Sequence, residues 1–501
     1  MKIQKVKVKG YKAFHKDYSF DIKGKNVFIY GENGSGKSSF YYALKDFFQS
    51  SIEKIDFDEL ENIFLTKKQK GKSYVKVTFK PDKDGNNTDK EYHLNNSSKN
   101  TFETGDTSIR DAVKLKSFFT YKHLLGIHYI DKNEKIDLFE LLVERVLKHF
   151  KSVAITGDIE LGELWSNVKS AVEKPLDGRR YNRTQKDRDV KQAIGDFNKA
   201  FKQLFDENNP EYILAHAQPI LDQFGHNIKI DLNYTQAVPN SKLDGVKRNN
   251  VRIKIMYLGK EVEKPHLFLN EARLSAIAIS IYLGMIRRHI QGIPCKVLFL
   301  DDIFIGLDIG NRLPLFKILE NEFADYQTFV TTYDKPWYEF MKFYLDGNSD
   351  WKCFEFYSRR ARKGFEIPVV KEQIDSSHIQ NFIDNGERYF NEGDNKAAGV
   401  YLRSAFEFIL KKYCRKKIPV LFRLSTSKLN TEHFWVALVK HEDEKDPSQR
   451  KLTEVTKNSI NNLRNLVLNP LSHHDVNKHE ITAEIQSAIN TIKTLKMELC
   501  V

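Results

Sequence analysis

The sequence is poor in cysteine and has no long apolar segment. Its 501 residues include four cysteines that lie far apart, Cys295, Cys353, Cys414 and Cys500. Such scattered thiols exclude a disulfide framework and a zinc cluster, and they favour a reduced, cytoplasmic setting. No apolar run approaches the roughly 20 residues of a membrane span. No apolar block of a signal peptide follows Met1. We therefore expect a cytoplasmic protein without a membrane partner.

Long heptad repeats and C-x-x-C pairs are also missing, which excludes an extended coiled-coil arm and a zinc hook. The composition, with 41% hydrophobic and 12% aromatic residues, is that of a folded protein, and the length suggests two to four domains. The net charge of +13 permits binding of nucleic acid. The basic residues are spread along the chain, so charge alone does not establish that partner.

The stretch GENGSGKSSFYYALKDFF, Gly31 to Phe48, fits the phosphate-binding pattern G-x-x-x-x-G-K-[ST]. A short apolar run precedes it and a helical apolar pattern follows, so we expect a loop between a strand and a helix. The loop amides and the helix N-terminus would bind phosphate, with Lys37 at the β- and γ-phosphates and the Ser38 hydroxyl on Mg²⁺. The predicted ATP-binding residues of this loop are Asn33, Gly34, Ser35, Gly36, Lys37, Ser38 and Ser39.

A second candidate element is KVLFLDD, Lys296 to Asp302, a continuous apolar run that ends in two acids. Such a run is typical of a buried parallel strand. Asp301 would hold Mg²⁺ through water, and Asp302 would polarise the water that attacks the γ-phosphate. The alternative is a pair of strand-end acids that cap the next helix. The P-loop in the same chain favours the catalytic interpretation.

About 260 residues separate Lys37 from Asp301, a spacing typical of SMC-, RecF- and ABC-like ATPase heads with an insertion. The opening VKGYKAFHKDYSFDIKGKNVFIYGENGSGKSS resembles the RecF/SMC type, with Lys12 where that family has an arginine that reaches the nucleotide. HLFLNEARLSAIAISIYLG, from His266 to Gly284, resembles the signature loop and helix, with Asn270 at the signature serine. IGLD, ending at Asp308, resembles the D-loop.

This resemblance implies an α/β ABC-type (RecF/SMC-like) ATPase head with a short helical insertion. It also implies ATP and Mg²⁺ as cofactors and a homodimer or larger assembly that sandwiches ATP between subunits. The chain departs from the family at Asn270, at Ala272 for glycine, at Asp302 for glutamate and at Tyr333 for histidine. These departures predict slow hydrolysis. The expected domains are 1–150 and 216–370 for the two head lobes, 151–215 for the insertion and 371–501 for a C-terminal helical domain.

The insertion reads as short, charged helices. Between them we expect the basic stretch GRRYNRTQKDRDVK, Gly178 to Lys191, which includes Tyr181. It would either track a phosphate backbone or form a solvated turn between helices. The following segments KIDLNYTQAV and NNVRIKIMYLG alternate like antiparallel strands that return to the head.

The C-terminal part reads as four to five helices and resembles the HEPN superfamily of helical bundles, which often act as RNases. NFIDNGERYFNEGDNKAAGVYLRSAFEFILKKYC predicts two helices joined at Glu392 to Asp394. The family's R-N-x-x-x-H frame begins here at Leu468 and ends at His473, so its arginine is missing. The resemblance to ATP-gated anticodon nucleases implies instead a set of Arg403, Glu407 and His473. The alternative is an ordinary ion pair one helical turn apart.

Three functions follow from these resemblances. The first is an ATPase subunit of a bacterial anti-phage defence system, similar to those of Septu and PARIS, that oligomerises, senses a phage-derived trigger and controls a nuclease effector encoded nearby. The second is a self-contained, ATP-gated HEPN-type RNase. The third is a RecF-like DNA repair ATPase. In the first, the C-terminal bundle would dock or assemble the complex; in the second, it would cleave RNA.

Overall fold

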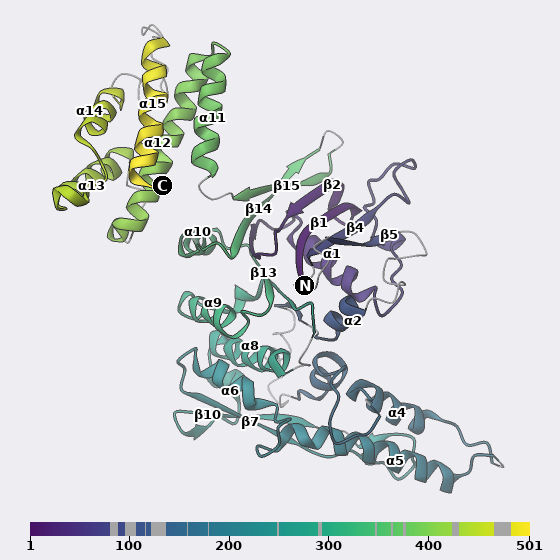
Figure 1. Ribbon diagram of the computed structural model, residues 1–501. Coiled ribbons are helices and arrows are strands. Elements are labelled where there is room, and N and C mark those ends of the chain that lie inside the picture. The colour runs from purple at the N-terminus through teal and green to yellow at the C-terminus, as the bar shows by residue number, and fades with distance from the viewer. Residues whose placement is uncertain are drawn as a thin grey trace. The chain divides into compact units, whose positions relative to one another are not determined.

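The computed structural model describes most of the chain. The described residues are 1–80, 89–95, 107–115, 117–121, 137–157, 159–178, 180–247, 250–288, 293–345, 348–361, 364–373, 377–422, 430–464 and 482–500. They form two compact units, Met1–Gln373 and Ile374–Val501, and Figure 1 shows the elements of each. Among the described residues, no helix has the length and apolar content that crossing a membrane requires.

The centre of the first unit is a six-stranded sheet in the order β15-β14-β3-β13-β12-β6. All neighbouring pairs are parallel except β14 with β15. Its strands are β3 (Asn26–Gly31), β6 (Phe118–Thr120), β12 (Val297–Asp301), β13 (Gln327–Thr332), β14 (Trp351–Arg360) and β15 (Glu366–Gln373). Every residue of β12 and β13 is buried, so the predicted buried parallel strand after Lys296 is confirmed.

An antiparallel sheet at the N-terminus, in the order β2-β1-β4-β5, faces the central sheet across a helix. Its strands are β1 (Lys2–Tyr11), β2 (Phe14–Asp21), β4 (Tyr74–Lys80) and β5 (Lys90–Asn95). The helix is α1 (Lys37–Gln49), whose Phe40 and Phe47 are fully buried. On β3, Val27 and Ile29 belong to this core, whereas Phe28 belongs to the core on the other side. Because successive side chains of a strand point to opposite faces, β3 thus contributes to the cores on both sides of the sheet.

The other face of the central sheet packs against helices that form the larger core of the unit (Figure 1). These are α8 (Glu271–Arg288), α9 (Ile309–Glu322) and α10 (Lys335–Tyr344). Smaller elements of the unit are η1 (Asp58–Leu60), α2 (Thr107–Lys114), the π-helix η3 (Leu141–Val146), η4 (Gln203–Phe205), α6 (Leu214–Asp222), α7 (Pro265–Phe268) and η5 (Ile303–Gly306). The strands β7 (Ile228–Tyr234) and β10 (Val251–Tyr257) pair antiparallel, which confirms the prediction for these segments. Short strands β8 (Val238–Pro239), β9 (Val246–Lys247) and β11 (Lys260–Glu261) accompany them.

The insertion forms a helical hairpin of α4 (Leu161–Glu173) and α5 (Arg183–Lys202). Asn182 caps α5 by accepting a hydrogen bond from the Gln185 amide, so most of the expected basic connection is helical. Tyr181 is only 6% exposed, and the Lys174 ammonium lies 3.9 Å from its ring centre. The expectation of a basic connection as long as Gly178 to Lys191 is therefore wrong, because the asparagine cap starts the helix early and Tyr181 packs inward.

The second unit is helical. It contains α11 (Ser377–Asn391), α12 (Asn395–Lys417), η6 (Pro419–Phe422), α13 (Thr431–Asp443), η8 (Pro447–Gln449), α14 (Glu454–Leu463) and α15 (Thr482–Leu499). The first two helices join at Gly393, whose φ of +84° is the left-handed conformation that ends a helix. The predicted helix pair with its join at Glu392 to Asp394 is thus confirmed. Apolar faces of α11 to α15 share one core.

Candidate nucleotide-binding site

The P-loop lies between β3 and α1, as its flanking sequence predicted. Gly34 and Gly36 adopt φ values of +82° and +100°, which glycine tolerates and other residues rarely adopt. A Cβ on Gly31 would lie 2.4 Å from Ser35 Oγ and 2.8 Å from Lys37 Cγ. The loop therefore turns tightly on glycines, and it leads directly into the N-terminus of α1, where backbone amides favour an anion.

Lys37 is held inside this loop. Its side chain is 5% exposed, and its ammonium donates hydrogen bonds to the carbonyl oxygens of Gly31 at 2.5 Å and Glu32 at 3.3 Å. The same ammonium lies 3.9 Å from Asp302 Oδ2. Burial lowers the pKa of Lys37, and the carboxylates of Asp302 and Asp301 oppose that shift. The loop thus carries a cation whose partners here are backbone carbonyls and one carboxylate.

The two acids at the end of β12 reach the P-loop from across the sequence. The Ser38 hydroxyl lies 3.5 Å from Asp301 Oδ2, so a serine oxygen and a carboxylate converge at the start of α1. Asp302 follows in the left-handed conformation, with φ of +52°, which is uncommon outside glycine and is often found at functional sites. The structure therefore brings together Lys37, Ser38 and both acids, although about 260 residues separate them in the sequence.

Asp302 has an unusual acidity. Burial raises its pKa, the neighbouring Lys37 ammonium lowers it, and the Asp301 carboxylate raises it again, to about 6 overall. A general base works best when its pKa lies near the working pH, because it is then deprotonated and still accepts a proton readily. Asp302 combines that basicity with a position beside the P-loop lysine.

Thr331, which the sequence did not single out, positions both acids. Its hydroxyl donates to Asp301 Oδ1 at 2.7 Å and accepts from the Asp302 amide at 3.0 Å. Thr331 is fully buried in β13, the parallel neighbour of β12. A sequence signal did exist, since a threonine near the end of the next parallel strand lies at the same sheet edge as the acids.

The residues present fit a magnesium-bound triphosphate. Ser35 Oγ is buried and has no hydrogen-bond partner among the described residues. This hydroxyl in the glycine-rich loop could therefore bind a ligand. The oxygens of Ser38 and Asp301 are the hard donors that Mg²⁺ prefers. When bound, Mg²⁺ would neutralise charge on the β- and γ-phosphate oxygens.

Two further predicted residues, Ser39 in α1 and Lys12 before β2, contact the P-loop helix or its neighbouring turn. Ser39 Oγ accepts a hydrogen bond from the Ala13 amide at 3.3 Å, which joins the turn between β1 and β2 to the P-loop helix. The Lys12 ammonium lies 4.0 Å from the Tyr42 ring centre and 3.9 Å from Asp46 Oδ2. Lys12 thus lies along α1 in this structure, and its predicted contact with nucleotide stays a prediction.

The predicted signature and D-loop residues begin helices. Asn270 is exposed at the N-terminus of α8, where its Oδ1 accepts from the Arg273 amide at 3.1 Å. Asp308 caps α9 by accepting from the Asn311 amide at 3.0 Å. Burial lowers the pKa of His226. The Arg273 guanidinium lowers this pKa further, whereas the Asp308 carboxylate raises it. Asn270 and Asp308 thus each cap a helix, and their predicted contacts with nucleotide stay predictions.

In the second unit, Arg403 Nε lies 3.1 Å from Glu407 Oε1, as the spacing of one helical turn implies. Thr431 also donates to Glu407 Oε1, at 3.1 Å. Leu468 and His473 lie outside the described residues. Among the described residues, the candidate RNase set is therefore an ion pair tied to the start of α13.

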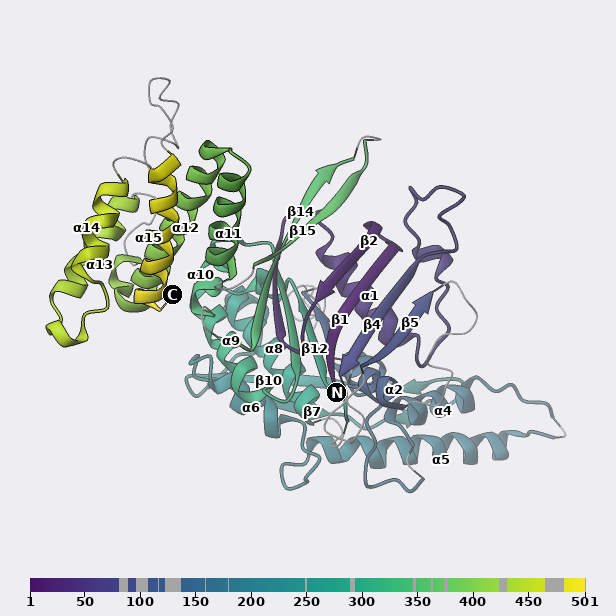
Figure 2. The same ribbon diagram turned by 45° about the horizontal axis from the view of Figure 1, so that its top comes forward.

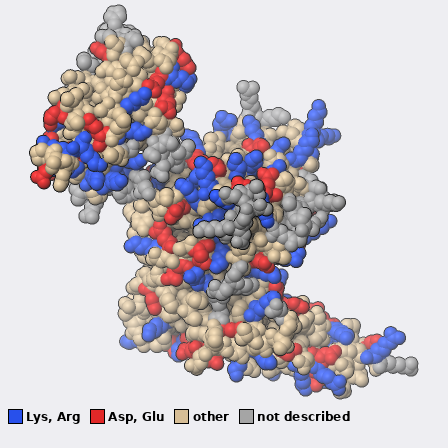
Figure 3. All heavy atoms as spheres, in the orientation of Figure 1, with Lys and Arg blue, Asp and Glu red and all other residues tan. Residues whose placement is uncertain are grey.

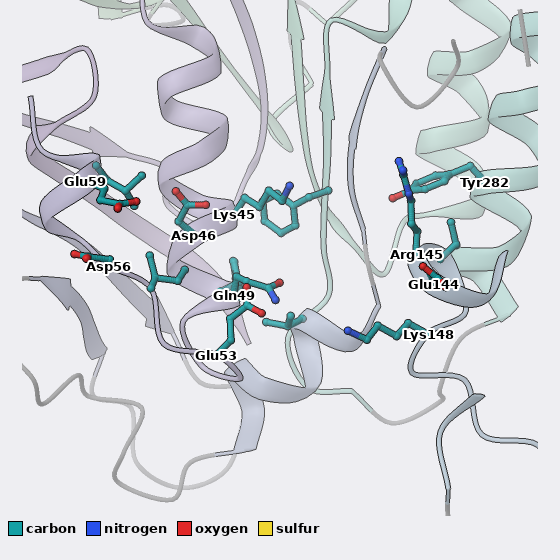
Figure 4. A pocket seen from close by; sticks show the side chains of 16 residues that line it. Lys45, Asp46, Gln49, Glu53, Asp56, Glu59, Glu144, Arg145, Lys148 and Tyr282 are labelled. Carbon is teal, nitrogen blue, oxygen red and sulfur yellow. The ribbon is translucent and has the colours of Figure 1, made fainter. Parts of the chain in front are cut away.

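A pocket of about 610 Å³ lies at the end of α1 opposite the P-loop. Asp46, Glu53 and Glu59 contribute acidic groups to its lining. Arg145 of the π-helix and Lys148, just after it, contribute basic groups (Figure 4). Tyr282 of α8 lines the same pocket. The P-loop helix α1 and the helix α8 thus border one cavity.

Comparison with known proteins places the chain in a family. Residues 2–347 match the family model described as the RecF/RecN/SMC N terminal domain. No curated protein matches the chain.

Two solved structures are similar at low identity. An SMC head bound to the C-winged helix domain of ScpA has 14% identity and a TM-score of 0.37, covering 74% of this chain and 98% of that one. The SMC head domain from Thermotoga maritima has 12% identity and a TM-score of 0.34, covering 75% and 100%. Since the family model spans more than half of the sequence, the chain belongs to the RecF/RecN/SMC N-terminal domain family of ATP-binding ATPases.

Proposed function

We propose that the chain is a slow, ATP-hydrolysing switch that self-associates around bound ATP and controls a nuclease effector in anti-phage defence. One observation carries the ATPase part of this proposal. Lys37 and Ser38 of the P-loop lie within 4 Å of Asp302 and Asp301, respectively, although these pairs are far apart in the sequence. The defence role is supported by the resemblance of the head and its C-terminal helices to defence ATPases.

The contacts of these residues support a route for hydrolysis. The P-loop amides and Lys37 would hold the β- and γ-phosphates, and Ser38 with Asp301 would hold Mg²⁺. Asp302 takes a proton from a water as that water's oxygen bonds to the γ-phosphorus. The bond from the γ-phosphorus to the bridging oxygen breaks, and ADP and phosphate leave. Because Lys37 now lies 3.9 Å from Asp302, phosphate binding would draw the ammonium away and release the carboxylate as a base.

Slow turnover is the expected result of this base. Aspartate is one methylene shorter than the glutamate of related ATPases, so its carboxylate reaches the water less well. The ion pair with Lys37 must also give way before Asp302 acts. A slow ATPase suits a latch, because the ATP-bound assembly then persists long enough to hold an effector.

Self-association is supported by the surface around Asn270. Leu267 and Phe268, just before it, are 58% and 64% exposed. Adjacent exposed apolar side chains of this size are a common sign of a protein interface. We assign this surface to contact the P-loop of a second copy of the chain, with Asn270 donating to the γ-phosphate.

For the second unit we propose a docking or assembly role. The Arg403–Glu407 pair supports it, because Glu407 already accepts from Arg403 and Thr431. On this proposal, purified protein with ATP leaves tRNA intact in the absence of any partner. Discrete cleavage that disappears in Arg403→Ala and in His473→Ala would establish the RNase instead.

The ATPase assignment is tested with two variants and a matched control. Lys37→Ala should abolish ATP binding in calorimetry, since it removes the charge that meets the β- and γ-phosphates. Asp302→Asn should bind ATP and release phosphate at least about 100-fold more slowly, since about 100-fold is the lower end of the usual contribution of a general base. Lys199→Ala, an exposed lysine of α5, should change neither. Normal turnover in Asp302→Asn would remove this residue from the reaction.

The defence role is tested in cells with the neighbouring genes present. Protection against phage should disappear in Lys37→Ala and on deletion of a neighbouring nuclease gene. Sensitivity to DNA damage without any phage phenotype would favour a repair ATPase.

A further inference from the structure

Three rings form a column beside the P-loop. The rings of Phe64 and Phe365 are stacked, with centroids 4.4 Å apart and planes inclined by 7°. The His15 ring lies 5.0 Å from Phe365 on a tilted plane. Phe64 is 49% exposed, so the column has an open end. Large exposed aromatic surface is costly to leave in water, and a π-stacking ligand would cover it.

Two elements carry this column to the phosphate cradle. The residue after Phe365 is Glu366, and a Cβ on Gly34 would lie 3.6 Å from its Oε2. Pro368 lies against Gly36 from the same strand, with 3.0 Å between its Cγ and a Cβ on that glycine. The hairpin of β14 and β15 thus packs directly on the P-loop. Figure 2 shows this hairpin extending past β2, and Tyr18 of β2 donates to the Pro368 carbonyl at 2.8 Å.

The opposite side of the column is tied to the P-loop as well. A Cβ on Gly36 would lie 3.7 Å from the Ala13 Cβ, the Ala13 amide donates to Ser39 Oγ, and His15 follows two residues later. Asn62 donates to the Lys12 carbonyl and accepts from the Phe64 amide at 2.9 Å, which fixes the Phe64 backbone on the turn between β1 and β2. Each ring is therefore anchored close to the P-loop. Phe365 precedes Glu366, His15 follows Ala13 by two residues, and Phe64 is held on the turn between β1 and β2.

We propose that the open end of this column, at Phe64, is the stacking platform for the nucleobase of the bound nucleotide. The inference rests on the proposed function, because it needs a nucleotide in the P-loop. Every base offers a π-face for stacking, so the platform should bind a nucleoside triphosphate more tightly than a triphosphate without a base. It should also favour purines over pyrimidines, because their rings are larger. It does not by itself separate adenine from guanine.

A purely structural role would have a different signature. If the rings only clasp the hairpin to the N-terminal sheet, their loss would disturb Glu366 and Pro368 and hence the phosphate cradle. Binding of any triphosphate would then suffer. If the rings bind a base, a ligand without a base is unaffected. Inorganic tripolyphosphate, which has the phosphates and no base, therefore separates the two roles.

The test measures binding of Mg²⁺ with ATP, GTP or inorganic tripolyphosphate to the full chain by calorimetry. Phe64→Ala should weaken ATP and GTP about tenfold and leave tripolyphosphate unchanged. Phe64→Trp should keep ATP affinity, since it retains a stacking ring. The control is Phe408→Ala in the second unit, an exposed phenylalanine with a stacked partner, Phe382, at 5.3 Å. It should change the affinity for neither ATP nor tripolyphosphate.

Each other outcome decides against the platform. Equal weakening of ATP and tripolyphosphate in Phe64→Ala would make the rings a clasp, and unchanged ATP affinity would leave them without a role in binding. Wild-type protein that binds tripolyphosphate as tightly as ATP would show that no base is recognised. Failure of the proposed function would give a different result. Lys37→Ala would then bind ATP as tightly as the wild type does, and the same would hold for tripolyphosphate.

Discussion

Glu442 is a buried carboxylate that the second unit keeps ionised. It is 1% exposed and accepts hydrogen bonds from the Tyr413 hydroxyl, from the Lys445 ammonium at 2.5 Å and from the Lys451 amide at 2.7 Å. Burial alone would raise its pKa, but these donors bring the pKa of Glu442 down to about 2. A buried charge with this many donors is stabilising only while every partner is in place.

Glu442→Ala should therefore lower the free energy of unfolding of the second unit by about 3 kcal/mol at pH 7, since it leaves Lys445 and Tyr413 without their acceptor. The folded pKa lies below the ordinary value, so the contribution is fully present above about pH 4.5 and is lost as the pH falls towards 2. Urea unfolding across this range should show the difference from wild type shrinking with acid. Glu444→Ala, an exposed neighbour, should cost little at any pH.

Thr331→Val tests the role of the hydroxyl that joins the two acids. The variant keeps the shape of the side chain but removes the hydrogen bonds to Asp301 and from the Asp302 amide. We expect the maximal ATPase rate to fall about tenfold or more, because misplacing a catalytic group by a fraction of an ångström is costly. The Kd for ATP should change little. Thr328→Val, at another buried threonine of β13, is the control, and an equal loss of rate in both variants would contradict the assignment.

The residues of the site differ in how far the sequence could predict them. Lys37, Ser38 and the two acids follow from local patterns, because the strand, loop and helix around each are contiguous in the chain. Thr331 does not, because its place beside Asp301 depends on the pairing of β12 with β13. Phe64 and Phe365 are harder still, since they meet only when the β14–β15 hairpin folds back over the P-loop.

At the scale of elements, α8 packs unusually closely on α6. A Cβ on Gly284 would lie 2.6 Å from both the Cα and the amide nitrogen of Ala217. Backbone atoms cannot move aside cheaply, so this position requires glycine for close approach. A Cβ on Gly195, in the middle of α5, would instead point into open space. The two helices thus carry glycines for different reasons.

Alanine at each glycine should act in opposite directions. Gly284→Ala should destabilise the first unit by about 1–3 kcal/mol, because the added methyl forces α8 away from α6. Gly195→Ala should stabilise it by about 0.5–1 kcal/mol, since alanine lowers the entropy cost of the helix without a clash. Thermal unfolding of the two variants beside wild type measures both. Both variants add one methyl group. Destabilisation by Gly195→Ala would therefore show that the low helix propensity of glycine does not limit the stability of α5.

The elements themselves were predictable where apolar spacing was regular. The β7–β10 pair and the α11–α12 pair follow from alternation and helical period, and Gly393 marks the join between the two helices. The start of α5 was not found, because the charged run after Asn182 has little apolar signal and reads equally as a loop or a solvated helix. The asparagine cap was the available sign.

At the scale of the molecule, the family match ends before the ATPase sheet does. The match stops at residue 347, whereas β14 pairs with β3 and β15 extends that sheet further. The hairpin that packs on the P-loop therefore lies outside the matched region, and its last residue, Gln373, directly precedes the second unit in the sequence. In the sequence, this hairpin is therefore the last part of the first unit before the helices of the second.

Charge gives little guidance about partners at this scale. The net charge of +13 could have marked a nucleic-acid surface. On the face shown in Figure 3, however, Lys and Arg side chains are interspersed with Asp and Glu side chains on both units. Interspersed charges do not create the continuous positive field that tracks a phosphate backbone. On this face, the distribution of charge therefore does not identify a partner.

Self-association should depend on ATP and on the surface at Asn270. In the Asp302→Asn background, which keeps ATP from being hydrolysed, we expect light scattering to report a dimer with ATP and a monomer without it. Adding Asn270→Arg should abolish the dimer, because a side chain much longer than asparagine would hold the two surfaces apart at this exposed position. Loss of the cap on α8 should cost only about 1 kcal/mol, so the monomer stays folded. Asn208→Arg, at an exposed turn, adds the same charge elsewhere and should dimerise normally. A dimer that forms equally well with Asn270→Arg, or without ATP, would place the interface on another surface.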